Sequence, residues 1–435
     1  MGSEGTSGSY GLSAGLAFGC AALLALAPAA LASTYRPNKT GDSPSGGLTL
    51  REAIAKANNH PGFDAVVLRA GTTYKLSIPG IDDTNAAGDL DIADIGGSGL
   101  TIKSSSNSRA TVDAQGIDRV FDVDTNAKFI RLRIRGGNSL GGGDGGGISG
   151  GGGKISLSFS RVVGNFTTGD AGGIDPGSGR LSVSRSVISG NRANDEGGGI
   201  QAGDLQGSTS ISKSTIKNNV ADADLSGGGG GGGIFNRRSM SIKSSTISGN
   251  RTSNSGNAGG GILNSDGTLN LVNSTIANNL ATAANGDGGG LSNGGAGAAV
   301  SMNAVTIARN SAGDEGGGFD TDGGSLIVRN SLIALNTATS SPDCNDASAP
   351  VTSFGQNLVG NNAFCTSFSA TSGDFVNLSS SKIGIGQLRN NGGPTRTIAL
   401  KSGSKAINNA GSDAPDRDQR GVKRQNKDIG AFERR

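Results

Sequence analysis

Five acidic residues stand just ahead of glycine-rich stretches in the middle of this chain, where their spacing could serve chemistry. Each precedes a large apolar residue by four positions, and the five are Asp144, Asp170, Glu196, Asp287 and Glu315. If the chain stacks these positions in one column, neighbouring carboxylates lie about 5 Å apart. That arrangement suits a hard cation such as Ca²⁺, which takes oxygen ligands, or the carboxylate pair of a glycoside hydrolase. A solvated column of turns, with its repulsion screened by salt, is the third alternative.

A polysaccharide lyase would also need a base, often Arg or Lys, beside such acids. The only basic pair within the central repeats is Arg237-Arg238. An isolated Arg pair is more often a solvated turn, and a chain with three Tyr and no Trp offers few platforms for sugar rings. We therefore name no catalytic residue and expect a protein without catalysis. Ca²⁺ is the one cofactor that the acidic column suggests.

The elements that would position this column come from an internal repeat. A glycine run closed by one apolar residue recurs about every 28 residues, a period typical of stacked repeat arrays, at Ile148, Ile174, Ile200, Ile234, Ile262, Leu291 and Phe319. Each run is followed by an apolar-x-apolar pair and then by Ser-x-Ile-x-x-Asn or a close variant. The asparagines are Asn165, Asn191, Asn219, Asn250, Asn279, Asn310 and Asn336.

This spacing predicts strands rather than helices. Apolar-x-apolar alternation places neighbouring side chains on opposite faces of a strand, and no unit carries the i, i+3, i+4 pattern of an amphipathic helix. Each unit therefore predicts three short strands, and the stacked units predict an all-β, single-stranded parallel β-helix of roughly ten coils. We expect the asparagines to stack through their amides and to take the left-handed conformation of a corner. Glycines would allow tight turns and close approach of adjacent coils.

Composition and charge agree with this fold class. The chain has 78 Gly and 4% aromatic residues, so a conventional globular core is not expected. Its formal net charge is +3, with both signs scattered along the sequence. A dedicated nucleic-acid binder would show a clustered basic stripe, so we expect no nucleic-acid partner.

The first residues predict export. Residues 12–32 are almost entirely apolar or small, and Ala30-Leu31-Ala32 fits a signal-peptidase site. An uncleaved anchor is the alternative, because no basic residue precedes the apolar run. In an exported protein, Cys344 and Cys365 predict a disulfide worth about 3 kcal/mol, with two free thiols as the alternative. These two cysteines and the distant His60 cannot complete a four-ligand zinc site.

A short helix is predicted to cover the exposed strand edges at the N-terminal end of the stack. Thr49 and Glu52 form a capping-box pair at its start, and the helix is expected to run to Asn58. Its apolar face consists of Leu50, Ala53, Ile54 and Ala57.

Two regions resemble known bacterial families. Residues 48–54 (LTLREAI) are similar to the N-terminal segment of CSLREA-domain proteins, and the repeats are similar to those of polymorphic outer-membrane and adhesin-like proteins. The tail resembles the choice-of-anchor Q domain through residues 357–360 (NLVG), 391–395 (NGGPT), 406–411 (AINNAG), 418–421 (DQRG) and 428–433 (DIGAFE). The resemblance implies a right-handed β-helix in an exported bacterial protein of largely unassigned function.

We therefore predict four parts: a signal peptide at 1–32, an N-terminal cap with a short helix at 33–62, a parallel β-helix at 63–340, and a choice-of-anchor-Q-like region with a disulfide loop at 341–435. After cleavage we expect a monomer without a membrane span, secreted or at the cell surface. Adhesion, presentation or binding of an extracellular polysaccharide or surface protein is the predicted role. A pectate-lyase-like polysaccharide lyase or a glycoside hydrolase acting on acidic polysaccharides is the alternative.

Overall fold

The structure is a computed structural model that describes residues 32–44, 46–139, 143–225, 229–349 and 351–435. The predicted signal peptide lies outside these residues except for its last position. The described residues belong to one compact unit, which contains the β-helix.

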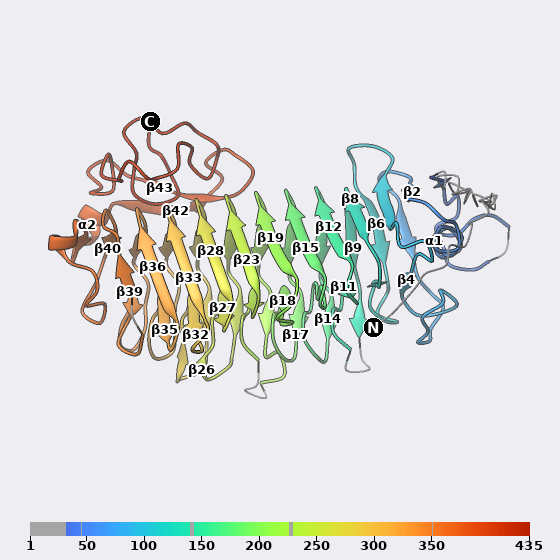
Figure 1. The fold of residues 1–435 in the computed structure, drawn as a ribbon, viewed down its shortest axis with the longest axis horizontal. Helices are drawn as coiled ribbons and strands as arrows, with labels where there is room; N and C mark the ends of the chain where they lie inside the picture. Colours follow the sequence, from blue (N-terminus) through green and yellow to red (C-terminus); the bar gives the residue numbers. More distant parts are fainter. Residues whose placement is uncertain (1–31, 45, 140–142, 226–228, 350) are drawn as a thin grey trace, which may run out of the picture. The chain divides into compact units, whose positions relative to one another are not determined.

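The apolar-x-apolar segments form sheet A, a sheet of 12 parallel strands (Figure 1). Its strands, in spatial order, are β1 (Thr34–Tyr35), β2 (Asp64–Leu68), β5 (Leu100–Ser104), β8 (Ala127–Ile130), β12 (Lys154–Ser158), β15 (Arg180–Ser184), β19 (Ser208–Ser212), β23 (Ser239–Lys243), β28 (Thr268–Val272), β33 (Ala299–Asn303), β36 (Ser325–Arg329) and β39 (Val351–Ser353).

The Ser-x-Ile segments form sheet B, which also has 12 parallel strands. They are β3 (Thr73–Lys75), β6 (Ala110–Asp113), β9 (Leu132–Arg135), β13 (Arg161–Val163), β16 (Val187–Ser189), β20 (Thr215–Lys217), β24 (Thr246–Ser248), β29 (Thr275–Ala277), β34 (Thr306–Ala308), β37 (Leu332–Ala334), β40 (Leu358–Val359) and β41 (Phe375–Val376).

The residues that close the glycine runs form the third side, sheet C. It comprises β4 (Leu90–Ile92), β7 (Phe121–Val123), β11 (Ile148–Gly150), β18 (Ile200–Ala202), β22 (Ile234–Asn236), β27 (Ile262–Ser265), β32 (Leu291–Gly294), β35 (Phe319–Asp322) and β38 (Cys344–Asn345). Bridges at Ile174 join its two halves. The three predicted strand columns are thus confirmed.

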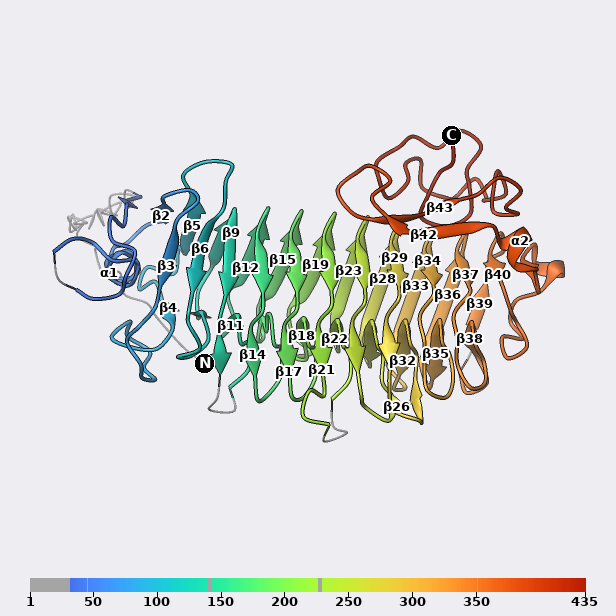
Figure 2. The same cartoon turned by 180° about the vertical axis from the view of Figure 1, so that it is seen from behind.

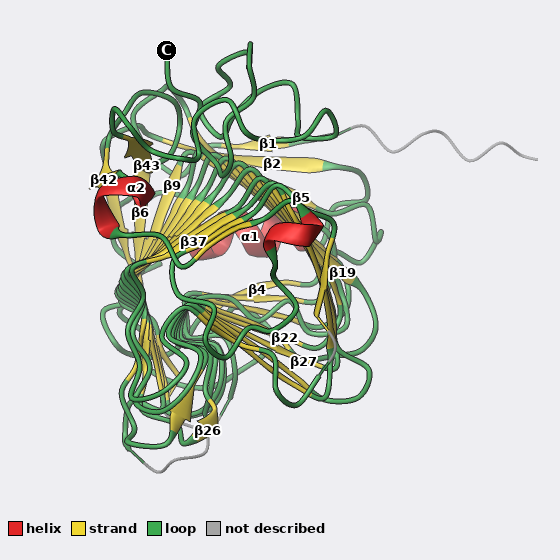
Figure 3. Ribbon diagram, turned by 90° about the vertical axis from the view of Figure 1, so that its left-hand side faces the viewer, coloured by secondary structure: helices red, strands yellow, loops and turns green. Residues whose placement is uncertain are grey.

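The register confirms the stacking of the aliphatic column. Ile188 pairs with Ile216, Ile216 with Ile247, and Ile247 with Ile276, and all four are fully buried. Figure 3, which looks along the stack, shows the strands of successive coils lying behind one another. The fold is an all-β, right-handed-type parallel β-helix of about 11 coils, as predicted from the repeat and the resemblance.

A fourth side was not predicted. Two-residue strands follow the asparagines and form sheet D, made of β10 (Asn138–Ser139), β14 (Phe166–Thr167), β17 (Arg192–Ala193), β21 (Val220–Ala221), β25 (Arg251–Thr252) and β30 (Leu280–Ala281). The pair β26 (Gly256–Asn257) and β31 (Gly286–Asp287) lies in two longer loops of the same region.

The asparagines form a continuous ladder of side-chain amides. Asn219 Nδ2 donates to Asn250 Oδ1 at 3.0 Å, and Asn250 Nδ2 donates to Asn279 Oδ1 at 2.9 Å. The last rung is an acid, because Asn336 Nδ2 donates to Asp343 Oδ1 at 2.9 Å. The amide stacking is therefore confirmed.

The predicted left-handed conformation of the ladder asparagines is wrong. Positive φ falls one residue earlier, at Gly164, Gly190, Asn218, Gly249, Asn278, Arg309 and Leu335. The corner is made there, so that the following asparagine can bury its amide between two coils. The last glycine of each run makes room for that amide: a Cβ on Gly233 would meet Asn250 Cγ at 2.9 Å.

Helix α1 (Leu50–Asn58) lies at the N-terminal end of the stack and has the predicted capping box. Its buried Leu50, Ala53 and Ile54 join the β-helix core. Arg51, whose role the helical pattern did not indicate, is also buried, since its guanidinium pairs with Asp42 at 2.9 Å. Arg51 also donates to the carbonyls of residues 87–89, so it fastens the helix to the first coils.

The β-helix continues past residue 340, where the repeat register is lost. Strands β38 to β41 still join sheets A, B and C, although the segment between them carries the predicted disulfide. Cys344 and Cys365 are bonded, with their Cα atoms 5.7 Å apart. The disulfide loop therefore lies among the last coils of the stack.

The remaining chain, residues 377–435, folds back over sheet B and is called the C-terminal region below. It contains the short helix α2 (Ser380–Ile383) and the antiparallel pair β42 (Ile385–Arg389) and β43 (Thr397–Leu400), which run across the strands of the β-helix (Figure 2). A 3-10 turn, η1 (Ala370–Ser372), precedes it. No helix in the described part of the chain is long and apolar enough to cross a membrane.

Sheet B is apolar on its outer face where the C-terminal region covers it. Ala277, Ala308, Leu332, Ala334 and Leu358 pack there against residues that include Ile385, Ile398, Ile429 and Phe432. Hydrogen bonds fasten the same surface. Thr275 Oγ1 donates to Gln419 Oε1 at 2.6 Å, and Ala431 N donates to Thr306 Oγ1 at 3.0 Å.

Candidate functional site

The acidic residues of the predicted column lie in two separate groups. In the first group two of the three acids bond to the coil that follows: Asp144 Oδ1 accepts from the backbone N of Asp170 at 2.9 Å, and Asp170 Oδ1 accepts from that of Glu196 at 2.7 Å. In the second group Asp287 Oδ1 accepts from the N of Glu315 at 3.1 Å. Asp144, Asp170 and Asp287 therefore each join neighbouring coils.

The first group lines an acidic cleft of about 320 Å³. The cleft is lined by Asp144, Asp170, Asp175, Glu196, Gln201, Gly203, Asp204 and Arg237. Sequence reasoning missed Asp175 and Asp204. Asp175 directly follows Ile174, the buried residue that closes the glycine run. This fixed position in the repeat could have indicated that Asp175 lies close to Asp170.

Burial makes these carboxyls weak acids. It raises the pKa of Glu196 to about 7, with a further rise from Asp170 and an opposing effect of the Arg237 guanidinium. Burial likewise raises the pKa of Asp170 to about 6 and that of Asp175 to about 7. Groups that titrate near neutral pH can give or take a proton during hydrolysis.

The metal prediction has no geometric support beyond the column itself. Among the described residues, no group of three or more His, Cys, Asp or Glu side chains is disposed to hold a metal ion. In the second group, Glu315 is occupied by bonds from Asn345 Nδ2 at 2.7 Å and Ser340 Oγ at 3.2 Å. A Ca²⁺ site at Asp144, Asp170, Glu196, Asp287 and Glu315 therefore stays a prediction.

The Arg237-Arg238 pair is divided between two roles. Arg237 is exposed and lines the acidic cleft. Arg238 is buried and donates to the carbonyl oxygens of Gly179 at 2.8 Å and Gly177 at 2.5 Å. Arg238 is therefore a structural residue.

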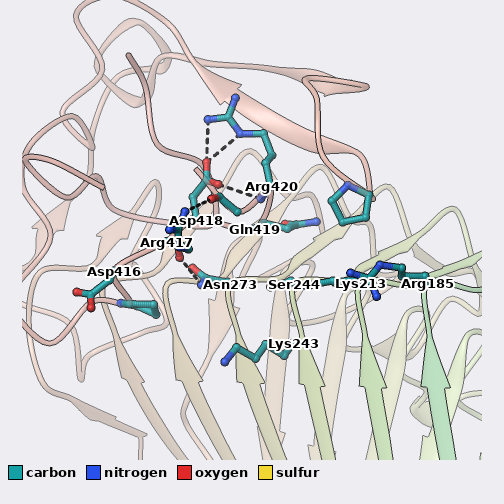
Figure 4. Close-up of a pocket in the computed structure, with 13 residues that line it drawn as sticks. Arg185, Lys213, Lys243, Ser244, Asn273, Asp416, Arg417, Asp418, Gln419 and Arg420 are labelled. Atoms are coloured by element: carbon teal, nitrogen blue, oxygen red, sulfur yellow. Dashed lines mark hydrogen bonds and ion pairs between the residues drawn. The ribbon is translucent and has the colours of Figure 1, made fainter. Parts of the chain in front are cut away.

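A larger groove lies between the β-helix and the C-terminal region. Its volume is about 650 Å³, and Figure 4 shows its side chains. On the β-helix side it is lined by Arg185, Lys213, Lys243, Ser244 and Asn273, and on the other side by Pro394 and residues 415–421. We call it the basic groove.

Four exposed cations give this groove its charge: Arg185, Lys213, Lys243 and Arg417. The side chains of Lys213 and Lys243 make no ion pair or hydrogen bond with other described residues.

The two acids of the groove wall are already paired within the C-terminal region. Asp416 lies 3.3 Å from Lys427 Nζ, and Asp418 lies 2.7 Å from Arg420. The groove thus presents uncompensated positive charge.

A smaller groove of about 360 Å³ shares Pro394 with the basic groove. It carries three further cations, Arg161, Lys217 and Arg396. The strands of sheet B present Arg161 and Lys217 on their outer face, just before the part of the sheet that the C-terminal region covers.

Sequence reasoning missed both the basic groove and the smaller groove beside it. Each coil of the β-helix contributes at most one cation to a given groove, so the charge looked scattered along the sequence. Only the stacking of coils brings these residues together.

Comparison with known proteins supports the fold. No protein-family model and no curated protein matches the chain. Among solved structures, the crystal structure of pectate lyase Pel9A is similar, with a TM-score of 0.51 and 15% sequence identity over 94% of this chain and 97% of that chain. At this identity the likeness concerns the parallel β-helix fold alone. The resemblance to CSLREA-domain and choice-of-anchor Q proteins stays a prediction.

Proposed function

We propose that this chain is an exported protein, secreted or held at the cell surface, that binds an anionic extracellular polymer without catalysis. The observation that carries the proposal is the basic groove, in which Lys213 and Lys243 have no anionic partner within the part of the chain that the structure describes. Uncompensated cations in a groove attract and orient polyanions. The disulfide between Cys344 and Cys365 supports export, because disulfides persist in oxidising compartments.

Binding to glycan and protein arrays, followed by titration of the hits, tests the proposal. The double variant Lys213→Ala/Lys243→Ala should weaken binding by about tenfold or more, and binding should fall as salt rises. The matched control is Lys154→Ala/Lys401→Ala, which removes two exposed lysines outside the groove. Equal binding by both double variants would reject the groove as the site.

A carbohydrate-active enzyme is the second candidate, supported by the raised pKa values of Glu196 and Asp170 in the acidic cleft. A carboxyl with a pKa of about 7 suits a general acid. The likeness to a pectate lyase makes pectate a natural first substrate. Incubation with acidic polysaccharides should then release reducing or unsaturated ends, and Glu196→Gln should abolish that release.

Calcium binding at the same cleft has its own test. A calorimetric titration with Ca²⁺ should give a saturable signal in the native chain and none in Asp170→Asn. No heat in the native chain would reject the site.

A further inference from the structure

At one corner of the β-helix, four successive coils carry long side chains where small ones are expected. In the coils whose sheet A strands are β8 to β36, the turn from sheet A to sheet B contains one residue at positive φ. In four consecutive coils these residues are Arg131 (φ 53°), Phe159 (φ 53°), Arg185 (φ 46°) and Lys213 (φ 49°). We call these four residues the turn row.

Positive φ is unfavourable for such residues, and Gly or Asn would relieve the strain. In the next coils the same position holds Ser244, Asn273 and Ala304, which are small or suited to this conformation. There the chain itself covers the turn, since Asn273 Nδ2 donates to the carbonyl oxygen of Arg417 at 2.7 Å. Strained bulky residues thus occur where the C-terminal region leaves the turn uncovered, and such strain often accompanies function.

The centre of the turn row is an exposed aromatic ring between two guanidinium groups. Phe159 is 38% exposed as a residue, and its ring centroid lies 5.0 Å from Arg131 Cζ and 5.5 Å from Arg185 Cζ. Arg109 Nε donates to the carbonyl oxygen of Phe159 at 2.7 Å, which adds a third arginine.

These arginines lack acidic partners. None of Arg109, Arg131 and Arg185 forms an ion pair with another described residue. Burial lowers the pKa of Arg109, and the neighbouring charges of Arg161 and Arg131 lower it further. An anion placed among these groups would relieve their mutual repulsion.

The turn row leads directly into the basic groove, because Arg185 and Lys213 belong to both. Figure 4 shows these two side chains on successive coils beside the groove. Coils rise by about 4.8 Å, so the charges repeat along a line instead of converging on one point. A line of charges fits a linear polymer better than a compact anion.

We infer that the turn row and the basic groove form one track for a linear anionic polysaccharide, lying along the stack of coils, with a sugar ring on Phe159. The inference rests on the proposed function and names its ligand class. Arginine binds carboxylate and sulfate groups through paired hydrogen bonds. The part of the Phe159 ring that the two guanidinium groups leave exposed offers an apolar surface against which the C–H groups of a sugar pack. A nucleic acid is less suited, because single strands stack successive bases on several aromatic rings and the row has one.

Four polymer probes with the full chain test this inference: polygalacturonate, dextran sulfate, polyphosphate and a single-stranded oligonucleotide. The first two distinguish carboxylate from sulfate recognition, and polyphosphate has charge without sugar rings. Phe159→Ala should raise the dissociation constant for at least one polysaccharide by about fivefold or more. It should change polyphosphate binding by less than about twofold, because the arginines remain.

Matched variants separate the alternatives. Phe354→Ala removes another exposed ring stacked on an arginine, Arg329, and should leave all affinities unchanged. Arg185→Ala should weaken binding of every anionic probe. Short oligogalacturonides should gain affinity with length until they span the four coils of the row.

Four outcomes overturn the inference. If Phe159→Ala affects polyphosphate as much as polysaccharide, the ring acts only by holding the arginines. If the oligonucleotide binds tightest and depends on Phe159, the ligand is a nucleic acid. If binding needs Lys213 and Lys243 but ignores Phe159, the proposed function survives and the polysaccharide track does not. If no polyanion binds at all, both fail.

Discussion

Replacement of Asn250 by alanine should strongly destabilise the β-helix. The side chain is fully buried, and its Oδ1 accepts from the backbone N and Nδ2 of Asn219, both at 3.0 Å. After the change, Asn219 Nδ2 still reaches the carbonyl oxygen of Ile188 at 3.2 Å, but its backbone N–H loses its one acceptor. An orphaned buried donor costs about 1–3 kcal/mol, and the lost amide also leaves a small cavity. We expect a loss of about 3 kcal/mol in the free energy of unfolding.

Urea unfolding followed by circular dichroism measures this loss. The control is Asn270→Ala, which removes an exposed asparagine on the outer face of β28 and should stay within about 0.5 kcal/mol of the native chain. Asn250→Asp should keep both bonds from Asn219 but bury a charge, so it should be less stable at pH 7 than at pH 5. A loss for Asn250→Ala no larger than that for Asn270→Ala would refute the reasoning that the ladder supports the fold.

Three further predictions concern charge, the disulfide and the C-terminal region. Because the pKa of Glu196 rises from 4.5 to about 7 on folding, the native state binds its proton more tightly, and stability should fall as pH rises through this window. Urea unfolding measures the decrease in unfolding free energy between pH 4.5 and pH 7.5. Glu196→Gln should make this decrease smaller by about 2 kcal/mol, after allowance for solvent screening. The same decrease in the variant and the native chain would contradict the assignment of the pH dependence to Glu196. Cys344→Ser should lower the unfolding free energy by about 3 kcal/mol, and a reductant should do the same to the native chain but not to the variant. Arg424→Met should lower the free energy of unfolding by about 3–5 kcal/mol, because it removes the Nη1 that lies 3.3 Å from Glu433 and leaves a buried carboxylate without its partner. Limited proteolysis should then cut the C-terminal region first. Unchanged cleavage would contradict the assigned contact.

The strand columns could be predicted from the sequence because local spacing determines them. Apolar alternation assigns each segment to a strand, and the repeat period assigns the strands to sheets. The capping helix and the disulfide were equally local signals. The position of the left-handed corner could not be read from such a local signal. It falls on the residue before each asparagine because Asn219 and Asn250 must place their amides within hydrogen-bonding distance between coils.

The basic track could not be predicted, because its residues are single turn positions in separate repeats. Arg131, Arg185 and Lys213 look like solvated charges until the coils are aligned by their residues at positive φ. The part of sheet B that the C-terminal region covers could have been predicted from the sequence. The outer residues of the sheet B strands change from Arg135 and Lys217 in early coils to Ala277 and Ala308 in later ones. Such a change marks the point at which a solvent-facing sheet becomes covered.

The C-terminal region is bonded to four successive coils through Thr246, Thr275, Thr306 and Asn330. A coil added or removed within this span would break its register with all of these partners at once. Among the described residues, the coils nearer the N-terminus carry no such bonds from the C-terminal region, so evolution can lengthen or shorten the stack there. The turn row lies in those adjustable coils. The number of sugar units that this part of the track holds can therefore change without disturbing the coils to which the C-terminal region is bonded.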